Sequence, residues 1–316
     1  MNVLLLLALP EAIRSKYYDA LSAHFPQVSF HLVDHHSKVD PYIESADALI
    51  TFGPHMSDRV LDKGVRLRWI QALGTGVDGI CDRAALREGI VVCNLHGVHG
   101  DSMSESALLS MLALARDLPR NLRAQSRHAW DRFTVRLLAG RTVGILGVGA
   151  IAADLAPRCK ALGMTVIGIS SARREVPGFD RMFGREQLVE AVRTVDFLIL
   201  LTPYSAETHG IVDARVLEAM KRDSVLINLA RGGIVDEQAL LAALRDGTIA
   251  GAALDVFSTE PLPADHEFWD MPNVIITPHL GGFHDKYVEK ALPVIEENLR
   301  KLMSGDTAGM RNVVRR

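Results

Sequence analysis

A glycine-rich turn follows an apolar run near the middle of the chain. The segment TVGILGVGAIAADLA carries Gly147, Gly149 and Ala152 in the spacing Gly-x-Gly-x-x-Ala. The first glycine permits a tight turn, the second lets the backbone approach a pyrophosphate, and the small third residue lets a helix pack on the strand. The helix offers free N–H groups to an anion, beginning at Ala150 and Ile151. The same glycines would suit an ordinary strand-to-helix turn, but the alternation of strand, turn, helix and strand favours dinucleotide binding.

The next apolar run, IGISSARRE, ends where the adenosine ribose of a dinucleotide is expected. An acid at this position normally accepts a hydrogen bond from the 2′-hydroxyl of NAD. Ser170 stands there instead, and Ser171, Arg173 and Arg174 offer hydroxyl and guanidinium donors that suit a 2′-phosphate. The alternative is that these arginines belong to a solvated loop. The stretch favours NADP(H), and Glu175 leaves NAD(H) possible.

Polar residues also follow four apolar runs farther along the chain. The carboxyl ends of parallel strands form the edge at which open α/β sheets bind ligands. We therefore expect the chemistry of this protein to gather at that edge. The residues concerned are Thr202 and Pro203 after the first run, Arg231 after the second, Asp255 and then Glu260 after the third, and His279 after the fourth.

The elements that would position these residues are short, continuously apolar runs that alternate with amphipathic segments of helical length. Continuous hydrophobicity indicates strands that are covered on both faces, as in parallel sheets between helices. The runs form two series, and 316 residues are enough for two domains. The sequence therefore predicts an α/β protein with two doubly wound, Rossmann-like parallel-sheet domains and an active-site cleft between them.

Composition points to a small-molecule partner. The chain has 35 basic and 38 acidic residues, a net charge of −3, so we expect no nucleic-acid partner and no binding to an anionic membrane. Three widely spaced cysteines form no metal or redox motif, which favours a reducing cytoplasm and no metal site. The apolar residues 3–10 are interpreted as a first buried strand, because no basic segment precedes them and a proline and an acid follow.

Taken together, these segments resemble the D-isomer-specific 2-hydroxyacid dehydrogenases. The resemblance covers nearly the whole chain and rests on LGTGVDGI, the glycine loop, LARGG, ALDVFSTEPLP and TPHLGG, which occur in the order of the family. It implies a discontinuous substrate-binding domain, residues 1–99 and 285–316, and an inserted dinucleotide-binding Rossmann domain, residues 100–284. It also implies a homodimer formed through the Rossmann domains.

The resemblance places the catalytic residues of the family on Arg231, Glu260 and His279. Their chemistry fits these roles. The forked donors of Arg231 suit a substrate carboxylate and the adjacent carbonyl. His279 can donate a proton to the carbonyl oxygen as hydride reaches carbon, and a neighbouring Glu260 would keep the imidazole charged and oriented.

Further roles follow from the resemblance. The backbone N–H groups of Thr75 and Gly76 resemble a cradle for the substrate carboxylate, and Asp255 resembles a residue that faces the nicotinamide carboxamide. Thr202, Pro203 and Ala230 are expected to line the cofactor. The chain departs from the family at His96, which replaces a frequent proline. His96 and His99 are interpreted as structural, with contact to the cleft as the alternative.

These observations predict an oxidoreductase that transfers hydride between NAD(P)H and a small 2-oxo acid to give the D-2-hydroxy acid. Within the family, the Ser-Ser-Ala-Arg-Arg turn is nearest in pattern to NADPH-dependent glyoxylate and hydroxypyruvate reductases. The alternative is a dinucleotide-sensing protein of the corepressor type without physiological turnover. Formate dehydrogenase, a related branch, is disfavoured because it carries glutamine where Glu260 stands.

Overall fold

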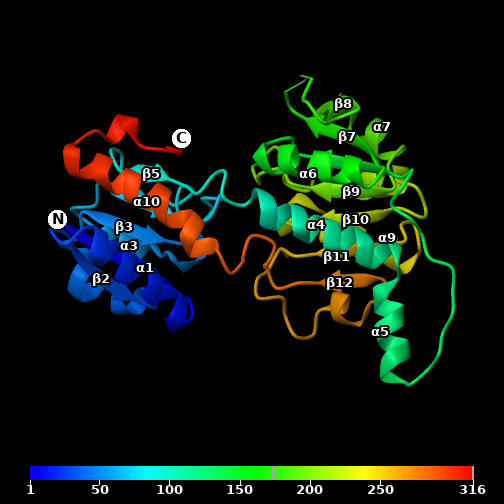
Figure 1. The fold of residues 1–316 in the computed structure, drawn as a ribbon, viewed down its shortest axis with the longest axis horizontal. Helices are drawn as coiled ribbons and strands as arrows, with labels where there is room; N and C mark the ends of the chain where they lie inside the picture. Colours follow the sequence, from blue (N-terminus) through cyan, green and yellow to red (C-terminus); the bar gives the residue numbers. More distant parts are fainter. Residues whose placement is uncertain (173–174, 315–316) are drawn as a thin grey trace. The chain divides into compact units, whose positions relative to one another are not determined.

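The chain folds into two compact units, each built on one parallel sheet. The computed structural model describes residues 1–172 and 175–314. Unit 1 comprises Met1–His99 and His284–Arg316, and unit 2 comprises Gly100–Phe283. Figure 1 shows both sheets with helices packed against them. The predicted α/β class with two parallel-sheet domains is confirmed.

Unit 1 contains a five-stranded sheet in the order β2-β1-β3-β4-β5 among the described residues. Every pair of neighbouring strands in it is parallel. Its strands are β1 (Asn2–Leu6), β2 (Ser29–Val33), β3 (Ala48–Thr51), β4 (Trp69–Ala72) and β5 (Val91–Cys93). Its helices are α1 (Glu11–His24), α2 (Asp40–Ile43), α3 (Asp58–Lys63) and α10 (Tyr287–Ser304), with short 3-10 turns at His36–Lys38, Gly53–His55 and Thr307–Gly309.

Helices cover both faces of this first sheet, as continuous apolar strands require. On one face, Leu5 of β1 lies in a core cluster with Tyr17 of α1 and Leu299 of α10. On the other face, Leu4 of the same strand packs in a cluster with α2 and α3. The helix formed by the C-terminal part of the chain therefore completes the core of the N-terminal part.

Unit 2 contains a seven-stranded parallel sheet in the order β12-β11-β10-β9-β6-β7-β8 among the described residues. Its strands are β6 (Thr142–Leu146), β7 (Thr165–Ser170), β8 (Arg181–Gly184), β9 (Phe197–Leu200), β10 (Val225–Asn228), β11 (Gly251–Leu254) and β12 (Val274–Ile276). Its helices are α4 (Gly100–Ala115), α5 (Leu118–Ser126), α6 (Ala150–Ala161), α7 (Leu188–Val192), α8 (Ala214–Ala219) and α9 (Glu237–Arg245), with 3-10 turns at Arg185–Gln187, Gly232–Ile234 and Glu267–Asp270.

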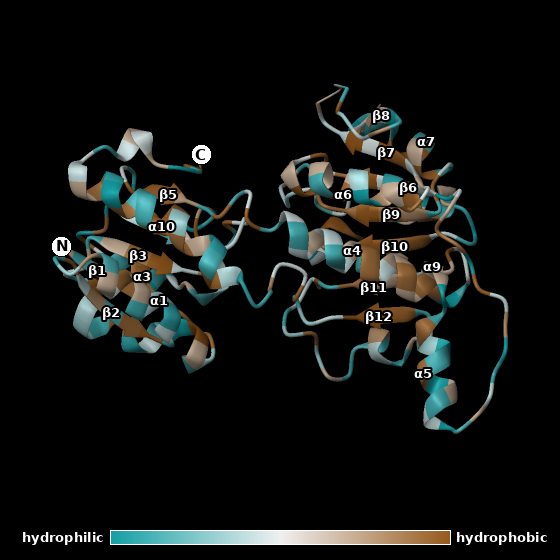
Figure 2. Ribbon diagram, in the orientation of Figure 1, coloured by the Kyte–Doolittle hydropathy of each residue, from teal (hydrophilic) through white to brown (hydrophobic). Residues whose placement is uncertain are grey.

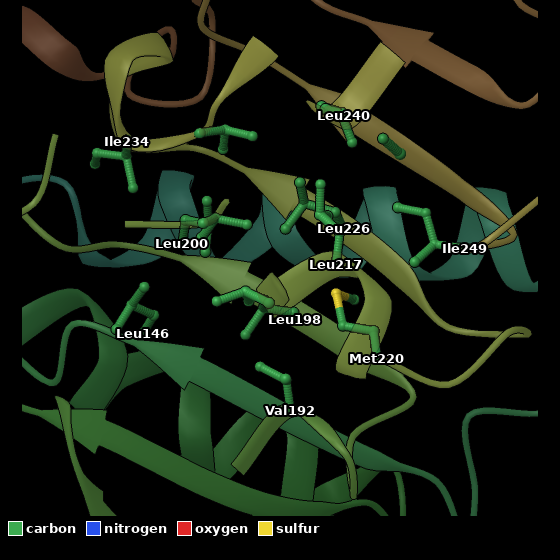
Figure 3. Packing of buried hydrophobic residues seen from close by; sticks show 14 of the residues in the cluster. Leu146, Val192, Leu198, Leu200, Leu217, Met220, Leu226, Ile234, Leu240 and Ile249 are labelled. Carbon is green, nitrogen blue, oxygen red and sulfur yellow. The ribbon is translucent and has the colours of Figure 1, made fainter. Parts of the chain in front are cut away.

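Two apolar layers enclose the second sheet. Strand side chains on one face pack against α4 and α6. On the other face, Leu198 and Leu226 pack with Leu217 of α8 and Leu240 of α9, and Figure 3 shows these side chains interleaved. The central strands of this sheet are accordingly coloured as hydrophobic in Figure 2.

The strand order places the glycine-rich turn where the chain changes direction across the sheet. β6 lies between β7 and β9, so successive strands run outward from β6 first to one side and then to the other. At such a switch point the loops after the two central strands lead to opposite faces and leave a crevice at the carboxyl edge. The turn after β6 and the segment after β9 both begin at this position.

Candidate active site

The glycine-rich turn after β6 has the geometry of a phosphate-binding loop. Gly147 has a φ of 101°, and a Cβ there would overlap the backbone N of Thr202, so a side chain is excluded. Ala152 is fully buried in the cluster formed with α4 and the sheet. A Cβ on Gly149, by contrast, would meet no described atom within 4 Å. The turn therefore packs closely on the segment after β9 at Gly147 and leaves space for an anion at Gly149.

The helix after this turn leaves its first N–H groups for a ligand. Gly149 is the N-cap of α6, and no side chain of the described residues caps that end. The first N–H groups of a helix have no partner within the helix, and the helix dipole favours negative charge there. Ala150 and Ile151, which were predicted to contact the cofactor, are the first two residues of α6. The residues present therefore fit a dinucleotide pyrophosphate.

The end of β7 lies beside the glycine turn. The N–H of Gly147 donates to the carbonyl oxygen of Ile169 at 2.9 Å, which brings Ser170 to the same edge of the sheet. Its Oγ accepts a hydrogen bond from the N–H of Ala172 at 3.3 Å, and Ser171 is exposed. Arg173 and Arg174 lie outside the described residues, so their predicted contact with a 2′-phosphate stays a prediction.

The turn after β10 fixes the backbone that carries Arg231. The side chain of Asn228, which is buried, accepts from the N–H of Ala230 at 3.1 Å and donates to the carbonyl oxygen of Arg231 at 3.0 Å. A Cβ on Gly232 would overlap the backbone carbonyl of Phe257, so the turn also packs closely on the segment after β11. Asn228 was not identified from the sequence, because an asparagine at a strand end gives no signal beyond that of a turn.

Asp255, the first residue after β11, holds the segment that follows β12. Its carboxylate is buried and accepts from the N–H of Leu280 and of Gly281, both at 2.8 Å, and from the hydroxyl of Thr277 at 2.5 Å. The sequence suggested contact with the nicotinamide carboxamide, which stays a prediction. In the structure, both carboxylate oxygens fix the turn that contains His279.

His279 and Glu260 form a direct pair at this turn. The Nδ1 of His279 lies 2.7 Å from a carboxylate oxygen of Glu260, and the histidine side chain is 44% exposed. His279 has a φ of 53°, which is unusual for a residue other than glycine. The residues that donate to Asp255 lie on both sides of His279 in the sequence, so they hold its backbone in this conformation. The imidazole is thus fixed through one ring nitrogen and accessible at its surface.

The charge on Glu260 is stabilised by its neighbours. Burial by itself would raise the pKa of this carboxyl, but the His279 hydrogen bond, the N–H of Phe257 at 2.9 Å and the nearby charge of Arg231 outweigh burial. The net result is a pKa below the usual range of a glutamate. The structure therefore brings Arg231, Glu260 and His279 together, with an ionised carboxylate beside the imidazole.

The predicted carboxylate cradle lies in unit 1, directly after β4. Among the described residues, no protein acceptor pairs with the N–H of Thr75 or that of Gly76, and both residues are partly exposed. The side chain of Asn94 donates to the carbonyl oxygen of Thr75 at 2.7 Å. His99, which was interpreted as structural, is buried and has both ring nitrogens within 2.9 Å of hydroxyl oxygens, whereas His96 is exposed.

The remaining predicted cofactor residues lie at the same edge of the sheet in unit 2. Thr202 and Ala230 are buried, and Pro203 is exposed. No group of three or more metal-ligating side chains occurs in the part of the chain that the structure describes. Within residues 1–172 and 175–314, no helix is long and apolar enough to cross a membrane.

A dinucleotide-binding sheet whose carboxyl edge carries an arginine and a carboxylate-paired histidine defines a nicotinamide-dependent oxidoreductase. Residues 108–281 match the family described as "D-isomer specific 2-hydroxyacid dehydrogenase, NAD binding domain". This chain therefore belongs to the D-isomer-specific 2-hydroxyacid dehydrogenase family and is an NAD(P)-dependent enzyme of that family.

Three relatives illustrate the range of the family. D-3-phosphoglycerate dehydrogenase of Methanocaldococcus jannaschii is 35% identical over 86% of this chain, which spans only 52% of that protein. Glyoxylate reductase of Korarchaeum cryptofilum is 32% identical over 84% of this chain and 82% of its own length. The crystal structure of a D-isomer specific 2-hydroxyacid dehydrogenase from Xanthobacter autotrophicus, in complex with NADPH and MES, has a TM-score of 0.86 and 30% identity, with 99% of this chain and 98% of the other covered.

Proposed function

We propose that this enzyme reduces a small 2-oxo acid, of the glyoxylate or hydroxypyruvate class, to the D-2-hydroxy acid. The observation that carries the proposal is the 2.7 Å pair of His279 and Glu260, placed at the same sheet edge as Arg231 and the phosphate loop. The similarity to a glyoxylate reductase over most of both chains supports the choice of substrate.

The residues of this chain divide the work of reduction. Reduced nicotinamide, when bound, supplies a hydride to the carbonyl carbon. Arg231 binds the carboxylate of the substrate and polarises its carbonyl through forked donors. His279 donates its Nε2 proton to the carbonyl oxygen, because Nδ1 is held by Glu260. In the oxidative direction the neutral imidazole accepts that proton. The backbone N–H groups of Thr75 and Gly76 donate hydrogen bonds to the substrate carboxylate as well.

We propose that the phosphate-bearing cofactor NADP(H) is preferred over NAD(H). No carboxylate stands at Ser170, where it would repel a 2′-phosphate, and Arg173 and Arg174 follow in the sequence. The related structure from Xanthobacter autotrophicus was determined with NADPH. Arg173→Ala combined with Arg174→Ala should raise the KM for NADPH far more than that for NADH. Arg222→Ala, an exposed arginine before β10, is the matched control. Equal effects on both cofactors would reject the preference.

We also propose that unit 2 binds the dinucleotide, that unit 1 binds the substrate, and that the protein is a cytoplasmic homodimer. Exposed large apolar side chains within residues 109–137 of unit 2 support self-association, and Trp130 among them is 92% exposed. The others are Leu109, Leu112, Leu118, Leu122 and Leu137. No disulfide joins the three cysteines, all within the described residues, which agrees with a reducing compartment. Trp130→Ser should lower the dimer fraction measured by sedimentation equilibrium.

The experiment that tests the activity uses the purified protein, NADPH and a panel of glyoxylate, hydroxypyruvate, pyruvate and longer or aromatic 2-oxo acids. We expect loss of NADPH absorbance with a small 2-oxo acid and chiral analysis to give the D-product. His279→Ala should lower turnover by roughly 10²–10⁴-fold with NADPH binding kept, which excludes a contaminating reductase. Absence of turnover with every acid would overturn the proposal in favour of a dinucleotide-binding role.

A further inference from the structure

A chain of hydrogen bonds, part-buried at Thr75 and buried beyond it, runs from the predicted carboxylate cradle to α10 in unit 1. The hydroxyl oxygen of Thr75 lies 2.9 Å from Nδ1 of His99, and Nε2 of His99 lies 2.9 Å from the hydroxyl oxygen of Tyr287. The Tyr287 hydroxyl then donates to the carbonyl oxygen of Leu73. The chain thus begins and ends on the same short stretch of backbone after β4.

The hydrogen bond to Leu73 favours one order of donors along this chain, and the carbonyl oxygen of Leu95 is a further partner of the His99 ring. The carbonyl of Leu73 can only accept, so the single proton of the Tyr287 hydroxyl is used there, and its oxygen accepts from Nε2–H of His99. Burial lowers the pKa of His99 to about 4, so the ring is neutral and carries one proton. Nδ1 is therefore an acceptor, and the hydroxyl of Thr75 donates to it.

This order has a consequence for the cradle. With its proton committed to His99, the Thr75 hydroxyl has only acceptor capacity left, so it cannot donate to an anion. The donors that remain for a carboxylate are the backbone N–H groups of Thr75 and Gly76, which have no protein acceptor among the described residues. Asn94 fixes the carbonyl of Thr75 on the other side of the same peptide segment.

We propose that His99 and Tyr287 are positioning residues that hold the loop of residues 74–76 so that its backbone N–H groups, and not the Thr75 hydroxyl, bind the substrate carboxylate. The inference rests on the proposed reduction of a 2-oxo acid. It adds to that function two residues that touch neither substrate nor cofactor and that act through Thr75 and Leu73.

Substitutions in this hydrogen-bond chain separate positioning from packing. His99→Phe and Tyr287→Phe keep an aromatic ring at each position but remove the polar atoms. Each should raise the KM for the 2-oxo acid roughly ten-fold, the factor expected when a buried hydrogen bond is lost. Because the cradle holds ground state and transition state alike, kcat should stay within about two-fold of the wild-type value. The dissociation constant of NADPH should not change.

His99→Gln provides the conservative rescue. A glutamine amide presents an NH₂ group and a carbonyl oxygen, so it can accept from Thr75 and donate to the oxygen of Tyr287. Its KM should lie near the wild-type value. Tyr17→Phe is the matched control, because Tyr17 is fully buried in the same core cluster as Tyr287 and its hydroxyl has no partner among the described residues.

A measurement on the unmodified protein does not depend on turnover. ¹⁵N NMR of histidine-labelled protein should show His99 as a neutral Nε2–H tautomer, assigned by the signal that disappears in His99→Gln. An Nδ1–H tautomer, or an unchanged KM in His99→Phe and Tyr287→Phe, would overturn the inference. If the wild-type protein turned over no 2-oxo acid, the proposed function would fail, and the tautomer would still report on the donor order.

Discussion

The charge of Glu260 stabilises the protonated imidazole of His279 that the proposed reduction needs. Glu260→Gln replaces the carboxylate by an amide of nearly the same shape, so the contact with Nδ1 can persist while the negative charge is lost. Because the pKa of Glu260 is below its usual range, the native carboxylate stays ionised across the assay range. Loss of this charge removes its attraction for the protonated imidazole, so the rate of 2-oxo acid reduction should fall in the variant.

The geometry of the His279–Glu260 pair sets the size of this fall in rate. Unit charges about 4 Å apart attract by about 4 kcal/mol at the effective dielectric constant of a protein surface, which is about 20. The Nδ1-to-carboxylate distance of 2.7 Å is shorter, but the side chains of His279 and Glu260 are 44% and 35% exposed, so solvent screens the pair. A remaining effect of roughly 1 kcal/mol lowers kcat by about five-fold.

The assay is a measurement of kcat for NADPH-dependent reduction with saturating substrate. Glu237→Gln is the matched control, since Glu237 also pairs with a histidine of unit 2, His266, at 3.2 Å. That control should leave kcat unchanged. A kcat in Glu260→Gln equal to that of the wild-type protein would refute the electrostatic role of Glu260 and would leave it only an orienting one.

Two other substitutions test the placement of the cofactor and of the catalytic histidine. Gly149→Ala should leave the melting temperature of the cofactor-free protein unchanged, because the new Cβ meets no described atom within 4 Å, but it should weaken NADPH in a fluorescence titration. Gly147→Ala, with its φ of 101°, should instead lower the melting temperature. Asp255→Asn places an NH₂ group opposite a backbone N–H, so kcat should fall by about ten-fold, the loss of one buried hydrogen bond.

The fold and the ends of its strands could be predicted from the sequence because both depend on local patterns. Continuous apolar runs indicated buried parallel strands, and their carboxyl ends carry Arg231, Asp255 and His279 as expected. The position of each polar residue follows from its distance to the end of its own strand. No knowledge of a distant partner is needed for that inference.

The hydrogen bonds of the site could not be predicted in the same way. Tyr287 lies 188 residues after His99, and nothing in either local sequence relates them. The bonds from Asp255 reach backbone N–H groups 25 and 26 residues later, and every residue except proline carries such a group. A backbone donor leaves no mark in the sequence, so the partners of a buried carboxylate become known only when the chain is folded.

The two carboxylates beside the catalytic turn therefore have different physical roles. Asp255 accepts only from uncharged donors, so its bonds fix the backbone of residues 277–281 and the position of His279. Glu260 faces the imidazole itself, so its charge acts directly on the ring. Removal of charge at Asp255 should displace the backbone of residues 277–281, whereas the same change at Glu260 should leave that backbone in place and remove the attraction for the protonated ring. Comparison of the two amide variants thus separates placement of the acid from stabilisation of its charge.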